Sequence, residues 1–292
     1  MPWQHLLDTP QRLPETSLEL WYAALLERLG EAGTFERALR GGWLAATPGL
    51  AFLAGYQAAL RALWPSAPPS LGALCVTEQR STRPADLGTR LDGLALTGRK
   101  DFVTAADAAD WLLVAARAEA AGEPPRLVLA VVHSGAPGVR IEPLSALPLM
   151  PDIGHARLHL DHAHCELLAG DGWDAYVKPF RTLEDVHVLT AISAWLLGNA
   201  RLQGWSQDLQ LRLLALLSGC AETSRQPPAA PATHLLLAGL FAQCAALQEE
   251  LAAAFASGPA ELAALWQRDR ALLEIARGPR AKRLDKAWAQ WR

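Results

Sequence analysis

Residues 75–117 read CVTEQRSTRPADLGTRLDGLALTGRKDFVTAADAADWLLVAAR, and this stretch decides the fold. The apolar run that ends in Val76-Thr77-Glu78 predicts a strand. Pro84, in the polar segment that follows, predicts a loop, because proline cannot donate a hydrogen bond within a central strand. Asp92-Gly93 predicts a tight hairpin, and segment 102–116 predicts two further strands. The stretch therefore predicts a small antiparallel β-unit.

Helical and strand patterns outside this stretch indicate the organisation of the chain. Amphipathic helices are expected at residues 16–29, 35–46 and 50–63. Further strands are expected at residues 127–132, 139–144 and 156–162, with a turn at 122–125. A helical tail is expected from residue 184, with later helices at 234–255, 259–276 and from 280. The predicted fold class is α+β, with an N-terminal helical unit (1–69), a middle antiparallel, barrel-like β-domain (70–180) and a C-terminal helical bundle (181–292).

The bulk composition argues against several classes of protein. The chain has 292 residues, of which 51% are hydrophobic, and a formal net charge of -3, so nucleic acid is not an expected partner. The four cysteines lie far apart and indicate neither a zinc site nor a disulfide framework, so a reducing cytoplasm is the expected location. No secretion signal is evident, and the longest apolar runs, such as residues 190–197, are too short to span a membrane.

The order of these motifs resembles the middle domain of acyl-CoA dehydrogenases. In that family a C-V-T-E strand, a loop ending in Asp and a D-G hairpin precede G-x-K-x-aromatic-aliphatic-Thr, which here is GRKDFVT at residues 98–104. The segment ARLHLDHAH at residues 156–164 resembles the strand by which that family leaves the β-domain. The resemblance covers residues 71–173 and the order of the three parts. It implies a divergent, shortened member with the acyl-CoA dehydrogenase fold.

The resemblance also implies a cofactor site. In the family, the first strand and the aromatic-x-Thr segment flank the isoalloxazine ring of FAD, so Val76, Thr77, Phe102 and Thr104 would contact the flavin. These residue types suit that role, because backbone amides and threonine hydroxyls can donate to the pyrimidine edge while an aromatic ring packs on the face. The alternative is an ordinary β-meander with a threonine in each strand.

The candidate catalytic base lies near the end of the chain. Residues 268–278, RDRALLEIARG, resemble the family's closing motif, in which a glutamate abstracts the substrate α-proton. The matching position here is Arg277, and a guanidinium stays protonated at neutral pH and cannot accept that proton. The resemblance therefore leaves Glu274, three residues earlier, as the candidate base.

Three departures from the family pattern bear on cofactor binding. The loop at residues 79–86, which contacts phosphate in the family, has no glycine, although Arg80 and Arg83 could contribute charge. The family's R-x-x-F-G segment, which reaches the FAD of a neighbouring subunit, has no counterpart between Asn199 and Cys220. Its G-G-x-G motif is reduced to Ser257-Gly258-Pro259. The resemblance thus implies that the chain binds FAD, and the alternative is that it has lost FAD binding.

Three functions stay open from the sequence. The first is an acyl-CoA dehydrogenase-like, FAD-dependent oxidoreductase acting on an acyl thioester, such as acyl-CoA, or a related small molecule. The second is a catalytically inactive protein of the same fold with a binding or assembly role, a possible pseudoenzyme. The third is a flavin-dependent monooxygenase, which uses reduced flavin and oxygen and needs no α-proton base. A homo-oligomer is expected for the first, because the family completes its flavin site across a subunit interface.

Two further patterns are candidates for sites. His155, His159, His162 and His164 suggest metal ligation, but in a regular strand the first two face away from the last two, so no metal site is predicted. The C-terminal residues 277–292 carry six basic residues against one acid and predict an amphipathic helix. Its apolar face, with two tryptophans, is expected to dock on the body of the protein or on a sister subunit.

Overall fold

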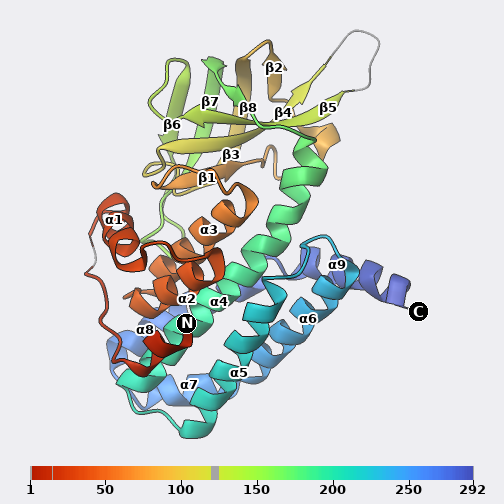
Figure 1. The fold of residues 1–292 in the computed structure, drawn as a ribbon. Coiled ribbons are helices and arrows are strands. Elements are labelled where there is room, and N and C mark those ends of the chain that lie inside the picture. The colour runs from red at the N-terminus through yellow and green to blue at the C-terminus, as the bar shows by residue number, and fades with distance from the viewer. Residues whose placement is uncertain (1, 15, 120–124, 292) are drawn as a thin grey trace.

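The computed structural model describes residues 2–14, 16–119 and 125–291, and in it a β-sheet stands on a layer of helices (Figure 1). Except for Pro125, the turn expected at residues 122–125 lies outside the described residues. The helices are α1 (Leu18–Leu29), α2 (Thr34–Leu44), α3 (Pro48–Leu63), α4 (Lys178–Leu202), α5 (Gln207–Thr223), α6 (Pro231–Ala246), α7 (Gln248–Ala256), α8 (Ala260–Asp269) and α9 (Arg277–Trp291). The strands are β1 (Gly72–Cys75), β2 (Arg90–Asp92), β3 (Ala95–Thr104), β4 (Trp111–Ala118), β5 (Arg126–His133), β6 (Val139–Pro143), β7 (His155–His164) and β8 (Glu166–Leu167).

The strands form one sheet in the order β6-β7-β3-β2-β4-β5-β8. Most neighbours are antiparallel, as predicted, but β4 has two parallel neighbours along one edge. Strand β1 pairs with the first half of β4, where Gly72 lies opposite Trp111, and β2 pairs with its end, where Arg90 lies opposite Arg117. The chain leaves the sheet after β1 and rejoins the same edge of β4 at β2, after segment 76–89. The expectation of a wholly antiparallel β-unit is corrected in these two pairings.

Strands β4 and β5 are buried on both faces. Along β4, Trp111 and Leu113 pack against the helices, whereas Leu112 and Val114 pack against β3 and β7 in a second cluster. This second cluster forms because the sheet curls over, and it explains why residues 111–116 are a continuous apolar run rather than an alternating one. The sheet therefore covers the helices with one face and its own far strands with the other.

The helices that precede the β-domain in the sequence and those that follow it pack into one layer. Helix α4 contacts α2 and α3 at close range, because glycine lets their backbones approach. A Cβ added at Gly55 of α3 would lie 2.8 Å from the carbonyl oxygen of His187 in α4. One hydrophobic cluster runs through α1 to α4 and the inner face of the sheet. The division of the chain at residues 69 and 180 stays a prediction.

Several helix boundaries differ from those predicted, because the sequence pattern did not show where each helix begins or ends. Helix α4 begins at Lys178, before the expected residue 184, since Pro179 can occupy a first helical turn. The expected helix at residues 234–255 is two helices, α6 and α7, separated at Leu247. The expected helix at 259–276 ends at Asp269, and the 3-10 turn Arg270–Glu274 connects it to α9.

Segment Pro231–Ala256, which contains α6 and α7, is long and apolar enough to cross a membrane by length and composition. This corrects the expectation that every apolar run is too short. The observation is weak evidence for a membrane span, because core helices pass the same test. Its buried residues recur at helical spacing and face the other helices; they are Leu237, Leu240, Cys244, Leu247, Leu251 and Phe255.

Candidate functional site

The four residues expected to contact flavin line one cleft between the sheet and the helices. Val76 and Thr77 follow β1, and Phe102 and Thr104 end β3, so both segments open toward α4. The cleft has a volume of about 340 Å³, which lies within the range of small-molecule sites. Its opposite walls are contributed by α3, by the first two turns of α4 and by the start of α9. The structure thus brings the two predicted segments together with residues as distant in sequence as Tyr56 and Arg283.

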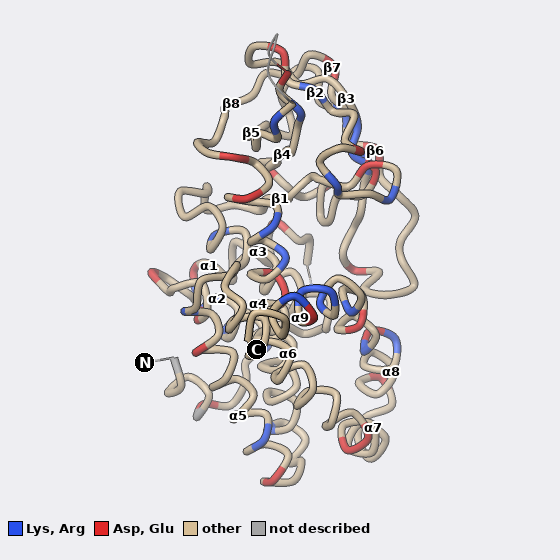
Figure 2. The backbone as a smooth tube through the Cα atoms, turned by 90° about the vertical axis from the view of Figure 1, so that its right-hand side faces the viewer, with Lys and Arg blue, Asp and Glu red and all other residues tan. Residues whose placement is uncertain are grey.

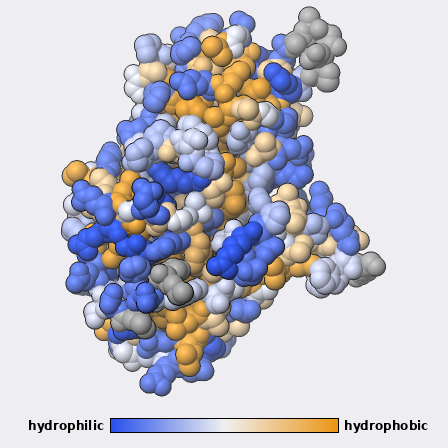
Figure 3. Space-filling model, in the orientation of Figure 1, coloured by the Kyte–Doolittle hydropathy of each residue, from blue (hydrophilic) through white to orange (hydrophobic). Residues whose placement is uncertain are grey.

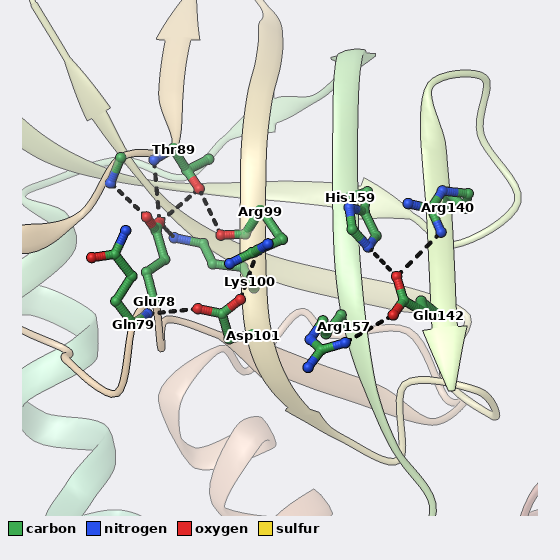
Figure 4. Close-up of polar contacts among 11 residues, drawn as sticks. Glu78, Gln79, Thr89, Arg99, Lys100, Asp101, Arg140, Glu142, Arg157 and His159 are labelled. Atoms are coloured by element: carbon green, nitrogen blue, oxygen red, sulfur yellow. Dashed lines mark hydrogen bonds and ion pairs between the residues drawn. The ribbon is translucent and has the colours of Figure 1, made fainter. Parts of the chain in front are cut away.

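A buried ion pair holds the two cleft-lining segments in register (Figure 4). The Lys100 ammonium is fully buried and donates to Glu78 at 2.5 Å and to the carbonyl oxygen of Ala115 at 2.6 Å. Glu78 also accepts from the Thr89 hydroxyl at 2.7 Å and from the Gly88 amide at 2.5 Å. Burial opposes the charge on Glu78, but Lys100 and these hydrogen bonds keep its pKa below the usual value. The Glu of the C-V-T-E motif and the Lys of G-x-K-x therefore neutralise each other's charge.

The turn that follows Glu78 adopts a left-handed backbone without glycine. Gln79 and Arg80 have φ angles of 46° and 64°, and Glu78 and Ser81 exchange two backbone hydrogen bonds around them. The Gln79 amide donates to Asp101 at 2.6 Å, and the Asp101 amide donates to the Thr77 carbonyl at 2.9 Å. These bonds hold the turn beside the cleft despite the steric cost of its backbone.

The hydroxyls of Thr77 and Thr104 are available to a ligand. Neither hydroxyl has a hydrogen-bond partner within the described residues, and both side chains are only partly buried. Phe102 is 40% exposed, and its ring stacks on His155 with a centroid distance of 4.5 Å. Two free donors and an aromatic ring on one wall match what the pyrimidine edge and the face of an isoalloxazine ring require. The residues present therefore fit a flavin ring in this cleft.

The helical wall combines aromatic and charged side chains. Tyr56 of α3 and Phe180 of α4 meet edge to face at 5.8 Å. Arg181 donates to the Thr82 hydroxyl at 2.7 Å and lies over the Trp173 ring, and it has no carboxylate partner within the described part of the chain. Thr82 comes from the loop that lacks glycine, so Arg181 brings that loop to the cleft.

Helix α9 is attached to this wall through Asp185. Arg280 donates to Asp185 at 3.0 Å, and Arg283 forms a second ion pair with the same carboxylate. The Arg280 guanidinium also lies 3.8 Å from the centroid of the Phe241 ring in α6. Figure 2 shows the basic residues of α9 grouped between the sheet and the lower helices. The basic C-terminal segment thus docks on the body of the protein, and Arg283 lines the cleft.

Glu184 is a carboxyl group of the cleft that the sequence analysis did not identify. It lies half-buried on α4, and within the described residues it has no hydrogen bond or ion pair. Burial, together with the adjacent Asp185, raises the pKa of Glu184 to about 8, while Arg283 lowers it in part. A carboxyl with such a pKa can exchange a proton near neutral pH. No motif marks this residue, since its character depends on what surrounds it.

Glu274 lies in neighbouring cavities rather than in the cleft. It lines two of them, both against Phe241 of α6, together with Arg270 in one and Arg277 in the other. Its side chain is 58% exposed, with the Arg277 guanidinium 3.8 Å away. The structure therefore does not bring Glu274 together with Val76, Thr77, Phe102 and Thr104 around one cavity, and its role as a base stays a prediction.

The histidines of β7 have separate environments. His155 is buried against Phe102, and His159 contacts Glu142 at 2.7 Å in a partly exposed cluster with Arg157 and Arg140 (Figure 4). His162 has a φ of 51°, which interrupts the strand alternation. Among the described residues, no group of three or more His, Cys, Asp or Glu side chains is placed to hold a metal ion.

Comparison with known proteins identifies the fold. No protein-family model matches the chain, and no curated protein is similar to it in sequence. Among solved structures, FkbI, described as acting in biosynthesis of the methoxymalonyl extender unit of the Fk520 polyketide, is 21% identical, with 94% of this chain and 93% of FkbI covered and a TM-score of 0.63. Butyryl-CoA dehydrogenase from Megasphaera elsdenii is 14% identical over 94% of this chain and 88% of its own, with a TM-score of 0.63. The apo form of PigA is 14% identical over 99% and 96%, with a TM-score of 0.64.

The chain has the acyl-CoA dehydrogenase fold. The fold class and the resemblance predicted from residues 75–117 are thereby confirmed. Within this fold the cleft lies where the sheet, α3, α4 and the start of α9 meet.

Proposed function

We propose that this protein is an FAD-dependent oxidoreductase of the acyl-CoA dehydrogenase type that acts on an acyl thioester or a related substrate. The observation that carries the proposal is the convergence of Val76, Thr77, Phe102 and Thr104 on one cleft, opposite Glu184. Similar solved structures support it, since one is a butyryl-CoA dehydrogenase and another an FAD-dependent dehydrogenase.

The residues of the cleft divide the work between two walls. Thr77 and Thr104 donate their free hydroxyls to the flavin edge, and Phe102 packs on its face. Bound FAD would supply the hydride acceptor. Arg181 and Arg283 hold the anionic end of the substrate near α4 and α9.

Glu184 acts as the acid–base group of the cleft. In its ionised form it takes the proton from the substrate Cα at a carboxylate oxygen, while the hydride leaves from the adjacent carbon. With a pKa of about 8, the carboxyl is mostly protonated at neutral pH and becomes a better base as the pH rises. Glu274 is the alternative base implied by the resemblance, and its exposed position outside the cleft makes it second to Glu184.

Cofactor binding is tested by titrating the purified protein with FAD and following the visible flavin band. Thr104→Val removes one donor without changing the shape of the side chain, and we expect FAD affinity to fall about tenfold. Thr97→Val is the matched control, because Thr97 is also on β3, but its hydroxyl accepts from the His162 amide outside the cleft. A folded wild-type protein that takes up no FAD would contradict the proposal.

The base is tested by anaerobic reduction of the bound flavin with acyl thioesters. Glu184→Gln is expected to retain FAD and bind substrate but to lose reduction by at least a hundredfold. Glu274→Gln is the comparison variant, and we expect it to reduce flavin at the wild-type rate. The opposite pattern would assign the base to Glu274. Substrate conversion that depends instead on oxygen and on reduced flavin from an added flavin reductase would assign the monooxygenase function.

A binding or assembly role is the second candidate, and the surface of α6 and α9 favours it. Leu236, Trp288 and Trp291 are 45%, 47% and 66% exposed beside one groove of α5, α6 and α9. In Figure 3 apolar side chains reach the surface in this region as well as over the sheet. A homo-oligomer would cover this face. Trp288→Lys/Trp291→Lys is expected to give monomers by light scattering if it does, and an unchanged mass would contradict self-association through α9.

A further inference from the structure

The cleft ends on an apolar wall where it meets α3 and the start of α4. Its sheet wall presents Thr77 and Thr104 beside Val76 and Phe102, and its α9 wall presents Arg283, which is paired with Asp185. The apolar end is formed by Tyr56 with Leu74, Val177 and Phe180. An aliphatic substituent bound in the cleft would therefore leave water at this end, and it could grow longer only by passing between α3 and α4.

Tyr56 closes this end of the cleft. Its side chain is only 3% exposed, and its ring stacks on Phe52 at 5.9 Å and meets Phe180 edge to face at 5.8 Å. The Leu74 amide donates to the Tyr56 hydroxyl at 2.8 Å, which fixes the ring against β1. A side chain held by two rings and a hydrogen bond does not swing aside without losing these contacts.

Directly beside Tyr56, the backbones of α3 and α4 touch. A Cβ at Gly55 would lie 2.8 Å from both the His187 carbonyl oxygen and the Cα of Val188, closer than side chains approach. A Cβ at Gly42 of α2 would lie closer still, 2.0 Å from the carbonyl oxygen of Ala191, one turn further along α4. The interface below Tyr56 therefore has no room for an alkyl chain between the helices.

We propose that the substrate of this cleft is a short acyl group on an anionic carrier, and that Tyr56 sets the limit on chain length. The short acyl end lies against Tyr56 and Phe180, and the carrier leaves past Arg181 and Arg283, where its negative charge is met. This substrate class rests on the proposed function, because it places the reacting carbon between the flavin-lining wall and Glu184.

A graded series of thioesters tests the limit. Binding of butyryl-, octanoyl- and dodecanoyl-CoA to the FAD-loaded protein is measured by isothermal titration calorimetry. In an open channel each added methylene would tighten binding roughly fourfold. With the closed end, octanoyl- and dodecanoyl-CoA are expected to bind more weakly than butyryl-CoA. Equal or tighter binding of the longer thioesters, or no binding of any of them, would overturn the proposal.

A variant pair tests the role of Tyr56 itself. Tyr56→Leu removes the ring that ends the cleft, and the ratio of octanoyl to butyryl affinity is expected to rise at least tenfold. Tyr22→Leu is the matched control, since Tyr22 of α1 is equally buried, at 4% exposure, but does not line the cleft. An unchanged ratio in a folded Tyr56→Leu protein would remove Tyr56 as the determinant. If that variant does not fold, the wild-type series still decides the substrate class.

The same titrations separate this inference from the proposed function. They are repeated on protein without added FAD. A protein that takes up no FAD but prefers butyryl-CoA refutes the oxidoreductase and supports the short-chain cleft. A protein that takes up FAD and binds dodecanoyl-CoA as tightly as butyryl-CoA supports the oxidoreductase and refutes the short-chain cleft.

Discussion

The two walls of the cleft use charge in opposite ways. On the sheet wall, Glu78 and Lys100 neutralise each other in the interior, and further hydrogen bonds satisfy the carboxylate. On the helical wall, Glu184 has no partner within the described residues, and Arg181 contacts a hydroxyl and a ring instead of a carboxylate. The difference indicates that the sheet wall is a rigid scaffold, whereas Glu184 and Arg181 on the helical wall are available for a ligand.

The largest effect is expected from a substitution in the sheet wall. Lys100→Met leaves Glu78 buried without its counter-charge and should lower the free energy of unfolding by about 3–5 kcal/mol. Urea titration followed by circular dichroism measures it. Arg157→Met is the control, because its partner Glu142 is at the surface, and no measurable change is expected there. If both variants unfold at the same urea concentration, burial does not distinguish the two carboxylates.

The next effect is at the attachment of α9 to the helical wall. Asp185→Asn removes the charge that Arg280 and Arg283 share and should cost about 2 kcal/mol, the usual value for hydrogen bonds to charged groups. Limited proteolysis should then cut first within α9. Asp174→Asn is the control, since Asp174 lies just before α4 and its ion pair with Lys178 is exposed. Equal protection of α9 in both variants would count against the attachment.

Glu184 should make the helical wall sensitive to pH. Its pKa in the folded protein is about 8, above the unfolded value of about 4.3, so the folded state binds the extra proton between these values. Its contribution to stability is present below the unfolded pKa and is lost as the pH rises through 8. Glu184→Gln should therefore be more stable than wild type at pH 9, by on the order of 1–2 kcal/mol after solvent screening, and equal to it at acidic pH. A difference that does not change with pH would exclude a raised pKa.

The smallest effect is expected in the turn beside the sheet wall. Arg80→Gly relieves a left-handed backbone at a non-glycine residue and should stabilise the protein by about 0.5–1 kcal/mol, as a shift in urea midpoint. Arg83→Gly is the control, because Arg83 has an ordinary φ of -74°, and glycine there should be neutral or slightly destabilising. A destabilised Arg80→Gly would mean that the Arg80 side chain contributes more than its backbone costs.

Local patterns predicted most of the strands. The run at residues 111–116 is apolar throughout because β4 is buried on both faces, and that burial is visible in the sequence. The D-G pair predicted the turn between β2 and β3, where Gly93 has a positive φ. The parallel pairings of β1 and β2 with β4 were not predicted, because strand direction depends on the path of residues 76–89 and not on their composition.

The sequence by itself indicated which residues line the sheet wall, since Val76, Thr77, Phe102 and Thr104 stand in motifs that resemble those of acyl-CoA dehydrogenases. Only the tertiary structure decided what faces that wall. Glu184 has a raised pKa, and Tyr56 ends the cleft, because α3 and α4 pack against each other and against α9 from distant parts of the chain. Periodicity reports which face of a helix is buried, but the desolvation of one carboxyl and the closing of one channel depend on neighbours that no local pattern specifies.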